Sequence, residues 1–206
     1  MSKIFDFMKN HFDFKIYNVT WIPVLVVLLI IPCVMYLPAE YGYENGLLEN
    51  MQMIFLFGAC IMGFCVKKNK KFFKFVSLVI IILMLREINC GRTLFFPIPG
   101  EVNAYYGWKD IKYGYLAHPI YGLYIASVVV YFLWNKLFIN LWNIIKNVKF
   151  PVWNILLMIL GIVLGLYAEK ATHNFVFEEM AELLVYTSLV GIIWLYGFNK
   201  NFQVEG

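Results

Sequence analysis

Long, uninterrupted apolar runs separated by short polar segments dominate this chain. The longest runs cover residues 21–36, 53–66, 75–85, 151–168 and 183–198. Because the apolar residues are contiguous and do not alternate with polar ones, the pattern disfavours a transmembrane β-barrel. Every backbone polar group inside lipid must be paired within its own segment, so runs of this kind form helices. The pattern therefore predicts an all-α, polytopic integral membrane protein.

We predict six transmembrane helices in a single domain that covers residues 1–206. A helix needs about 20 residues to cross a hydrocarbon core about 30 Å thick. The first helix follows a polar leader that contains Asp6 and Asp13 and has no small-x-small cleavage site, so we expect a retained helix and no signal peptide. The expected helices cover about 20–38, 47–66, 73–91, 118–138, 150–169 and 178–198, with an outer loop at about 92–117.

The distribution of basic residues predicts the orientation. The expected N-terminal segment, the link between helices two and three, the link between helices four and five and the C-terminus hold twelve of the 17 Lys and Arg residues and three of the 13 acidic ones, a net charge of +9. The opposite side holds five basic and ten acidic residues, a net charge of −5. By the positive-inside rule, both termini are cytoplasmic.

Composition excludes the soluble classes. The chain is 62% apolar and 15% charged, whereas globular domains are about 45–50% apolar and about 25% charged. Nucleic-acid binding requires a basic face on a soluble domain, so the overall charge of +4 is taken as an orientation signal and no nucleic-acid partner is expected. The partners expected are membrane lipids. Abundant Lys, Asn, Ile and Phe suggest a bacterial cytoplasmic membrane.

Two segments are expected to lie in the cytoplasmic interface. Residues 3–14 place apolar side chains on one stripe, which predicts a short amphipathic helix. From Lys136 to Asn147, polar residues recur at spacings of four, three and four, opposite an apolar stripe that includes Trp142. We therefore expect helix four to continue into an amphipathic cytoplasmic extension.

Small residues at a spacing of four suggest close helix packing. Gly161 and Gly165 form such a pair in helix five, and Ala59 and Gly63 form another in helix two. The Gly161/Gly165 face could form a homo-oligomer, and packing between neighbouring helices of one chain is the favoured alternative. The four cysteines contain no CxxC motif, so we expect neither a disulfide framework nor a thiolate zinc site.

Ionisable residues gather at the outer helix ends and form the candidate site. The stretch from Phe75 to Leu85 is only eleven residues long, about 16 Å of helix at 1.5 Å per residue. Arg86 and Glu87 should therefore lie below the outer surface, where charged groups are costly and are functional candidates. The residues expected at this depth are Glu49, Arg86, Glu87, His118, Glu169, His173, Glu178, Glu179 and Glu182.

Several of these glutamates have a simpler structural interpretation. Glu49, Glu178, Glu179 and Glu182 lie in first helical turns, where the macrodipole favours carboxylates, so they could be solvated caps. The remaining two, Glu87 and Glu169, lie at helix C-termini and need a partner. The candidates for that partner are Arg92, Lys170, a histidine or a metal. Arg86 projects about 100° away from Glu87 on a helix, so it need not be the partner.

The candidate roles follow from side-chain chemistry. As acid and base we nominate Glu87, His118 and Glu182, while Arg86 and Arg92 could bind phosphate through their planar guanidinium groups. A divalent metal is a candidate cofactor, because bundle cores bind metals through inward Glu and His residues. Its expected ligands are Glu49, Glu87, Glu169, His173, Glu178 and Glu182.

Three functions remain open. The first is a membrane-embedded enzyme that acts on a lipid or lipid-linked substrate and uses the candidate metal or the acid–base residues alone. The aromatic outer loop would then be either a lid or an interfacial anchor. The second is a non-catalytic scaffold in which the cluster is a structural ion-pair network. The third is a small ion-coupled transporter, which is disfavoured because the polarity is confined to one side of the membrane. GxSxG, HExxH, P-loop and GxGxxG motifs are absent from the sequence.

Overall fold

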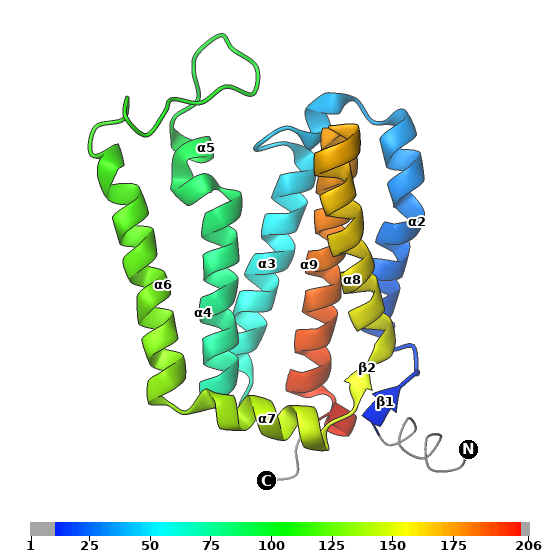
Figure 1. The fold of residues 1–206 in the computed structure, drawn as a ribbon. Coiled ribbons are helices and arrows are strands. Elements are labelled where there is room, and N and C mark those ends of the chain that lie inside the picture. The colour runs from blue at the N-terminus through cyan, green and yellow to red at the C-terminus, as the bar shows by residue number, and fades with distance from the viewer. Residues whose placement is uncertain (1–10, 203–206) are drawn as a thin grey trace.

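The computed structural model describes residues 11–202, and they form a bundle of lengthwise helices with one helix lying across its lower end (Figure 1). The long helices are α2 (Trp21–Tyr36), α3 (Leu47–Cys65), α4 (Lys70–Glu87), α6 (Ala117–Trp134), α8 (Val152–Tyr167) and α9 (Phe175–Phe198). The shorter elements are β1 (Phe12–Asp13), η1 (Asn18–Thr20), η2 (Ala39–Gly42), η3 (Asn89–Gly91), α5 (Arg92–Phe95), η4 (Gly114–Leu116), α7 (Leu137–Asn147), β2 (Phe150–Pro151), η5 (Ala168–Thr172) and η6 (Lys200–Phe202).

Five helical segments in the described part of the chain are long and apolar enough to cross a membrane. They are Asn18–Tyr36, Ala39–Cys65, Gly114–Trp134, Val152–Thr172 and Phe175–Phe198. The prediction of a helical membrane protein is thereby confirmed at the level of class. The remaining long helix, α4, carries three lysines in its first turns and Arg86 and Glu87 at its end, so its composition is less apolar.

Helix α9 is the centre of the bundle. It packs against α8, α3 and α2, and α3 also packs against α4. Within the protein, 56% of the apolar window of α9 is buried, against 6% for α6. Asn174 caps the start of α9 by accepting a hydrogen bond from the backbone N–H of Phe177 at 3.0 Å. The outward faces of the surrounding helices are apolar and exposed, as a lipid environment requires.

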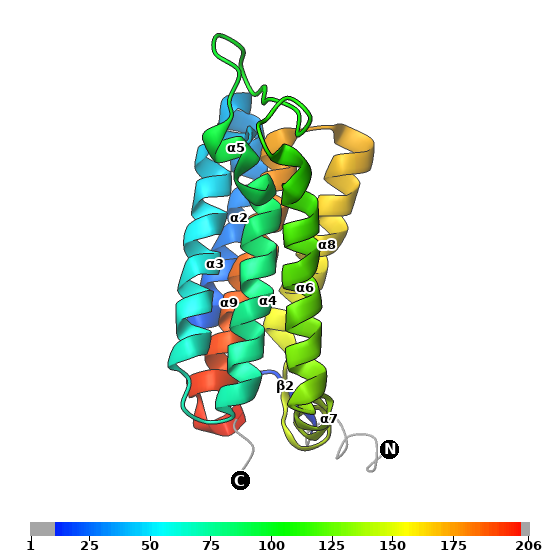
Figure 2. The same ribbon diagram turned by 90° about the vertical axis from the view of Figure 1, so that its left-hand side faces the viewer.

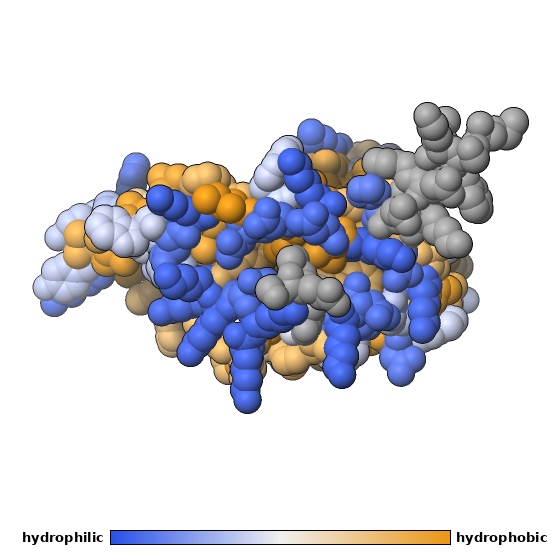
Figure 3. Space-filling model, turned by 90° about the horizontal axis from the view of Figure 1, so that it is seen from below, coloured by the Kyte–Doolittle hydropathy of each residue, from blue (hydrophilic) through white to orange (hydrophobic). Residues whose placement is uncertain are grey.

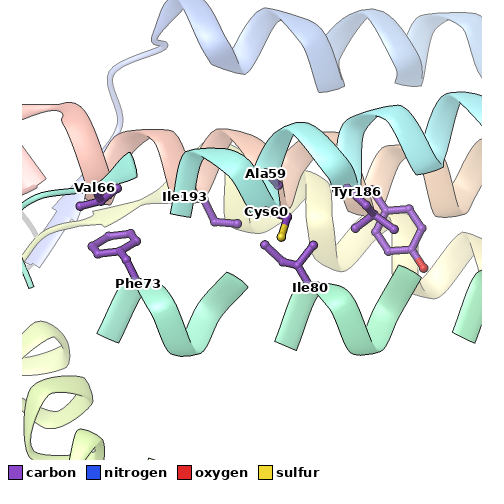
Figure 4. Packing of buried hydrophobic residues seen from close by; sticks show 8 residues of the cluster. Ala59, Cys60, Val66, Phe73, Ile80, Tyr186 and Ile193 are labelled. Carbon is purple, nitrogen blue, oxygen red and sulfur yellow. The ribbon is translucent and has the colours of Figure 1, made fainter. Parts of the chain in front are cut away.

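The packing of α3, α4 and α9 is close because small residues lie at the contacts. Buried side chains of the three helices interdigitate, and Tyr186 lies among them with its hydroxyl directed towards α4 (Figure 4). A Cβ atom on Gly63 would lie 2.2 Å from Ser77 Oγ, so only glycine fits there. Ser77 in turn donates a hydrogen bond to the carbonyl of Cys60 at 2.9 Å. The Ala59/Gly63 pair thus packs helices of one chain together.

Helix α6 is joined to α4 mainly along one edge (Figure 2). The hydroxyls of Tyr121 and Tyr124 donate to the backbone carbonyls of Ile82 and Leu78, at 3.3 and 3.2 Å. Since α6 is otherwise exposed and apolar, most of its surface faces lipid.

Two expectations about the interfacial segments are corrected. Helix α6 does not continue past Asn135, because Lys136 adopts a left-handed backbone with φ of 52°, and α7 begins as a separate helix across the lower end (Figure 1). In the N-terminal segment, residues 3–10 lie outside the described residues. Its following part is no helix at Phe12–Asp13, because these residues pair in parallel with Phe150–Pro151.

Candidate functional site

Side chains from the outer ends of α4 and α9 meet in one polar network. Arg86 and Glu87 form the last turn of α4, and Glu182 and Tyr186 lie four residues apart on α9, which places them on one face. The Arg86 guanidinium contacts Glu87 Oε1 at 2.7 Å and Glu182 Oε1 at 3.2 Å. Its Nη2 also donates to the Tyr186 hydroxyl at 3.1 Å.

Glu87 is the best-satisfied carboxylate of this network. Besides the Arg86 contact, its Oε1 accepts a hydrogen bond from the Tyr186 hydroxyl at 2.6 Å. Its side chain is 8% exposed, against 28% for Glu182 and 56% for Arg86. Charge-assisted hydrogen bonds of this length are the strong ones, so Glu87 is held in one position. Glu182 has a longer contact with Arg86, also interacts with Glu87, and has the more exposed side chain of the two glutamates.

Arg86, which the sequence did not require as the partner of Glu87, is its partner in the structure. On a helix the two side chains leave the backbone about 100° apart. At the end of α4 the long Arg86 side chain has room to turn back, so its Nε also donates to Glu87 Oε1 at 2.9 Å. The adjacent residue is therefore the partner, and neither Arg92 nor Lys170 is needed.

A groove of about 300 Å³ lies beside the network, between α4, α8 and α9. Its outer end is charged and its inner part is apolar. Its wall on α8 includes Ile162 and Leu166, which are 46% and 50% exposed, so the groove borders the lipid-facing surface. The lining residues are Leu83, Arg86, Gly161, Ile162, Gly165, Leu166, Glu169, Glu178, Glu182, Val185, Tyr186 and Leu189.

The groove also contains two glutamates of the predicted site. Glu169 lies in the π-helical turn η5 and Glu178 in the first turn of α9, and the two interact electrostatically. Together with Glu182 they place three carboxylates around the groove, and among residues 11–202 Arg86 is the only Lys or Arg that lines it. Carboxylates therefore outnumber guanidinium and ammonium groups in its lining.

The two histidines of the predicted site do not join this network. His118 belongs to α6, is exposed, and has its ring edge-on to Trp108 at a centroid distance of 5.6 Å. His173 lies in the turn before α9 and lines a separate hollow with Val34 and Leu37 of the α2 side. Helices α6 and α2 lie at opposite sides of the bundle (Figure 1), so the two rings cannot act on one ligand.

Arg92 is likewise outside the groove. It follows Gly91 at the start of α5 and lies over the ring of Tyr105, with a guanidinium-to-centroid distance of 6.0 Å. Phosphate binding by Arg86 and Arg92 together is therefore not supported, because the two side chains face different surroundings.

The outer loop folds onto the start of α3 and leaves the groove uncovered. The Tyr105 hydroxyl donates to the carbonyl of Glu44 at 3.0 Å, and the backbone N–H of Glu44 donates to Asn103 Oδ1 at 3.1 Å. Burial raises the pKa of Tyr105. None of the groove residues comes from 92–117, so the contacts of this loop do not favour the lid alternative.

A second set of polar side chains, from α3 and α9, is more buried than the Arg86 network. Glu49 is only 4% exposed, so the expectation that it is a solvated cap is wrong. Gln52, one turn further along α3, is fully buried. Its side-chain amide donates to the backbone carbonyl oxygen of Glu179 at 2.8 Å and to Glu179 Oε2 at 2.7 Å. Gln52 was not among the predicted site residues. An amide three residues after Glu49, within an apolar helix, is the sequence signal that could have identified it.

The predicted metal ligands are not gathered into one site. Within the described residues, no group of three or more His, Cys, Asp or Glu side chains is arranged to hold a metal ion. Glu87 and Glu182 share the network, Glu169 and Glu178 lie along the groove, and Glu49 is buried. His173 lines a separate hollow and interacts electrostatically with Glu178.

The small-residue pair of α8 packs within the chain. A Cβ on Gly161 would lie 2.8 Å from a methyl of Val185 and 2.9 Å from the carbonyl of Ala181, so α8 approaches the α9 backbone there. This contact uses the Gly161 face for internal packing. Association of two chains through Gly161/Gly165 stays a prediction.

Comparison with known proteins gives no further assignment: no family model, curated protein or solved structure matches this chain.

Proposed function

We propose that this protein binds a lipid or lipid-linked molecule in the groove between α4, α8 and α9 and performs acid–base chemistry on its polar head. The observation that carries the proposal is the shape of the groove, which is apolar along Leu83, Val185 and Leu189 and charged at its outer end. An amphiphile that enters from the bilayer would place its chain on the apolar lining and its head at the charged end. Ligand sites commonly combine an apolar lining with a few placed polar groups.

The residues divide into distinct roles. Glu182 is the proposed acid–base residue, because it lines the groove, its side chain is 28% exposed and its contact with Arg86, at 3.2 Å, is longer than that of Glu87. Arg86 and Tyr186 are positioning residues, and Glu87 orients Arg86. We propose acid–base chemistry without a metal, because within the described residues the carboxylates along the groove are not arranged to bind one.

Charge indicates which head group fits. The Arg86 charge is balanced by Glu87 and Glu182. Glu169 and Glu178 add further carboxylates along the groove, and His173 interacts electrostatically with Glu178. Like charges that lack a counter-ion repel in a medium of low dielectric constant. A neutral or cationic head group is therefore favoured over the phosphate expected from the sequence.

A non-catalytic scaffold is the second candidate, because one observation favours it. The contacts of Glu87, Arg86 and Tyr186 are all made within the chain, as expected of an ion pair that holds α4 against α9. Such pairs can fix helix register without chemistry.

The proposed topology has six spans with both termini cytoplasmic. Its support is the course of α4, which runs lengthwise beside α3 and α6, and the position of β1 and η6 at the same end of the bundle (Figures 1 and 2). Two ends on one side require an even number of crossings. Hydrophilic residues gather on this lower face, with apolar areas between them (Figure 3), and α4 begins at this end with three lysines in its first turns. We assign the protein to a bacterial cytoplasmic membrane.

Lipid retention tests the groove. Gly165→Leu should fill it, since a Cβ at Gly165 has only an ordinary contact of 3.8 Å with Ala181, whereas Gly122→Leu on the open surface of α6 is the matched control. Native mass spectrometry of the purified protein is expected to show a bound lipid in the wild type and in Gly122→Leu. Retention should fall about tenfold or more in Gly165→Leu. Equal retention in both variants would refute the groove as the binding site.

Turnover separates the enzyme from the scaffold. Wild type and Glu182→Gln would be reconstituted with a bacterial lipid extract, and the lipid pool followed by mass spectrometry. Loss of an acid–base group is expected to lower the rate by about 10²–10⁴-fold while the bound lipid is retained. A wild type that retains lipid and converts none of it would support the non-catalytic candidate.

A further inference from the structure

The buried polar group between α3 and α9 is separate from the groove and contains oxygen atoms that accept no hydrogen bond from the described residues. These atoms are Glu49 Oε1, Gln52 Oε1 and Thr93 Oγ1, on side chains that are 4%, 0% and 1% exposed. A buried polar atom without a partner costs about 1–3 kcal/mol, and more when it is charged. Two carbonyl-type oxygens and a hydroxyl in this state point to a species bound among them.

The three residues belong to one chain of contacts. The backbone N–H of Asn45 donates to Glu49 Oε2, and the Asn45 side-chain amide donates to the carbonyl of Thr93. Glu49 and Gln52 lie three residues apart on α3 and so share a face. Gln52 donates its amide to Glu179 at 2.7 Å, which leaves its own oxygen free to face a ligand.

Negative charge at this position is not balanced by the protein. Within residues 11–202, both ion pairs are made by Arg86, one with Glu87 and one with Glu182. Glu49 and Glu179 interact electrostatically with each other and with Glu87, so all three carboxylates are of one sign and near one another. A buried charge with no counter-ion is strongly unfavourable, so a positive species should accompany these two carboxylates.

We infer that Glu49, Gln52 and Glu179 bind one hard cation through their side-chain oxygens, with Thr93 at the outer end of the site. Carboxylate, amide and hydroxyl oxygens are the donors that Na⁺, Ca²⁺ and Mg²⁺ prefer. The site joins α3, α5 and α9, so an ion bound there would hold the outer end of the bundle together. Its residues are not those that line the lipid groove, and Glu179 interacts electrostatically with Glu182 of that groove.

The test is thermal unfolding of the full chain in detergent, in a choline buffer free of Na⁺ and divalent ions, at constant pH and ionic strength. NaCl, CaCl₂ or MgCl₂ is then added alone. One of these ions is expected to raise Tm saturably, by roughly 5–10 °C at a hundred times its dissociation constant. Glu49→Gln and Gln52→Met should lower the affinity for that ion at least tenfold. Glu101→Gln, which removes a carboxylate from the exposed outer loop, should respond as the wild type does.

Equilibrium dialysis of the wild type with the same ion keeps the inference testable if a variant fails to fold. One ion bound per chain is expected. The inference is overturned if no ion binds, if all variants respond equally, or if Tm changes with pH and with none of the three ions, since protons would then compensate these carboxylates.

Discussion

At the residue scale, the outer network depends on hydrogen bonds that remove the cost of burying charge. Glu87 is almost completely enclosed, and Arg86 and Tyr186 provide its contacts. The Tyr186 ring belongs to the apolar core of α3, α4 and α9, whereas its hydroxyl belongs to the network. One side chain thus connects the packing of the bundle to the charge at its outer end.

Tyr186→Phe separates these two contributions. The ring packing is retained, and Glu87 loses a 2.6 Å hydrogen bond. We expect a loss of about 1.5–3 kcal/mol in the free energy of unfolding, the usual range for a hydrogen bond to a charged group. Tyr196→Phe on the same helix is the control, because its hydroxyl donates to the neutral carbonyl of Lys149 at 3.2 Å, worth about 0.5–1.5 kcal/mol. Reversible unfolding in mixed micelles measures both, and equal losses would contradict this account.

At the element scale, the helices differ in how they are held. Helix α9 is surrounded by α2, α3 and α8, whereas α6 contacts α4 along one edge through tyrosine hydroxyls. Interhelical hydrogen bonds in membranes contribute about 0.6 kcal/mol on average. Close approach of backbones is therefore the stronger attachment, and α3 and α4 have it at Gly63.

Gly63→Ala tests that close approach. The new methyl would overlap Ser77 Oγ and lie 3.2 Å from the carbonyl of Phe73, so α3 and α4 must separate and the Ser77 bond to Cys60 is lost. Overpacking of this kind costs about 1–3 kcal/mol, seen as a lower Tm. Gly58→Ala on the same helix has nothing within 4 Å of the new methyl, and alanine favours the helix by up to about 1 kcal/mol there. If both variants had the same Tm, the α3–α4 contact would not be tight.

At the scale of the whole molecule, charge separates the two ends of the bundle. Hydrophilic residues gather on the lower face of the bundle (Figure 3), where α4 begins with three lysines in its first turns. Glu87 lies at the other end of α4, where it meets Glu182 of α9 through Arg86. If the two ends of α4 lie on opposite sides of the membrane, α4 crosses it. The side on which each end lies then gives the orientation of the protein.

Labelling of single cysteines placed before and after α4 measures both the orientation of the protein and the crossing of the membrane by α4. In a variant whose four cysteines are replaced by alanine, Lys68→Cys and Val102→Cys place one thiol before α4 and one after α5, both at exposed positions. A membrane-impermeant maleimide is expected to label Val102→Cys in intact bacterial cells, and Lys68→Cys only after permeabilisation. Labelling of both from outside would show that α4 does not cross, and the reverse pattern would show the opposite orientation.

The sequence by itself determined the helical membrane class, the approximate helix positions and the separation of charge, because these depend on local composition and on the 1.5 Å rise of a helix. Only the tertiary structure decided which polar side chains meet. Arg86 turns back to Glu87, His118 and His173 lie on opposite sides, and Gln52 is buried against Glu179. Such contacts depend on the order and rotation of helices around α9, and these are set by packing between residues far apart in sequence, such as Gly161 with Val185.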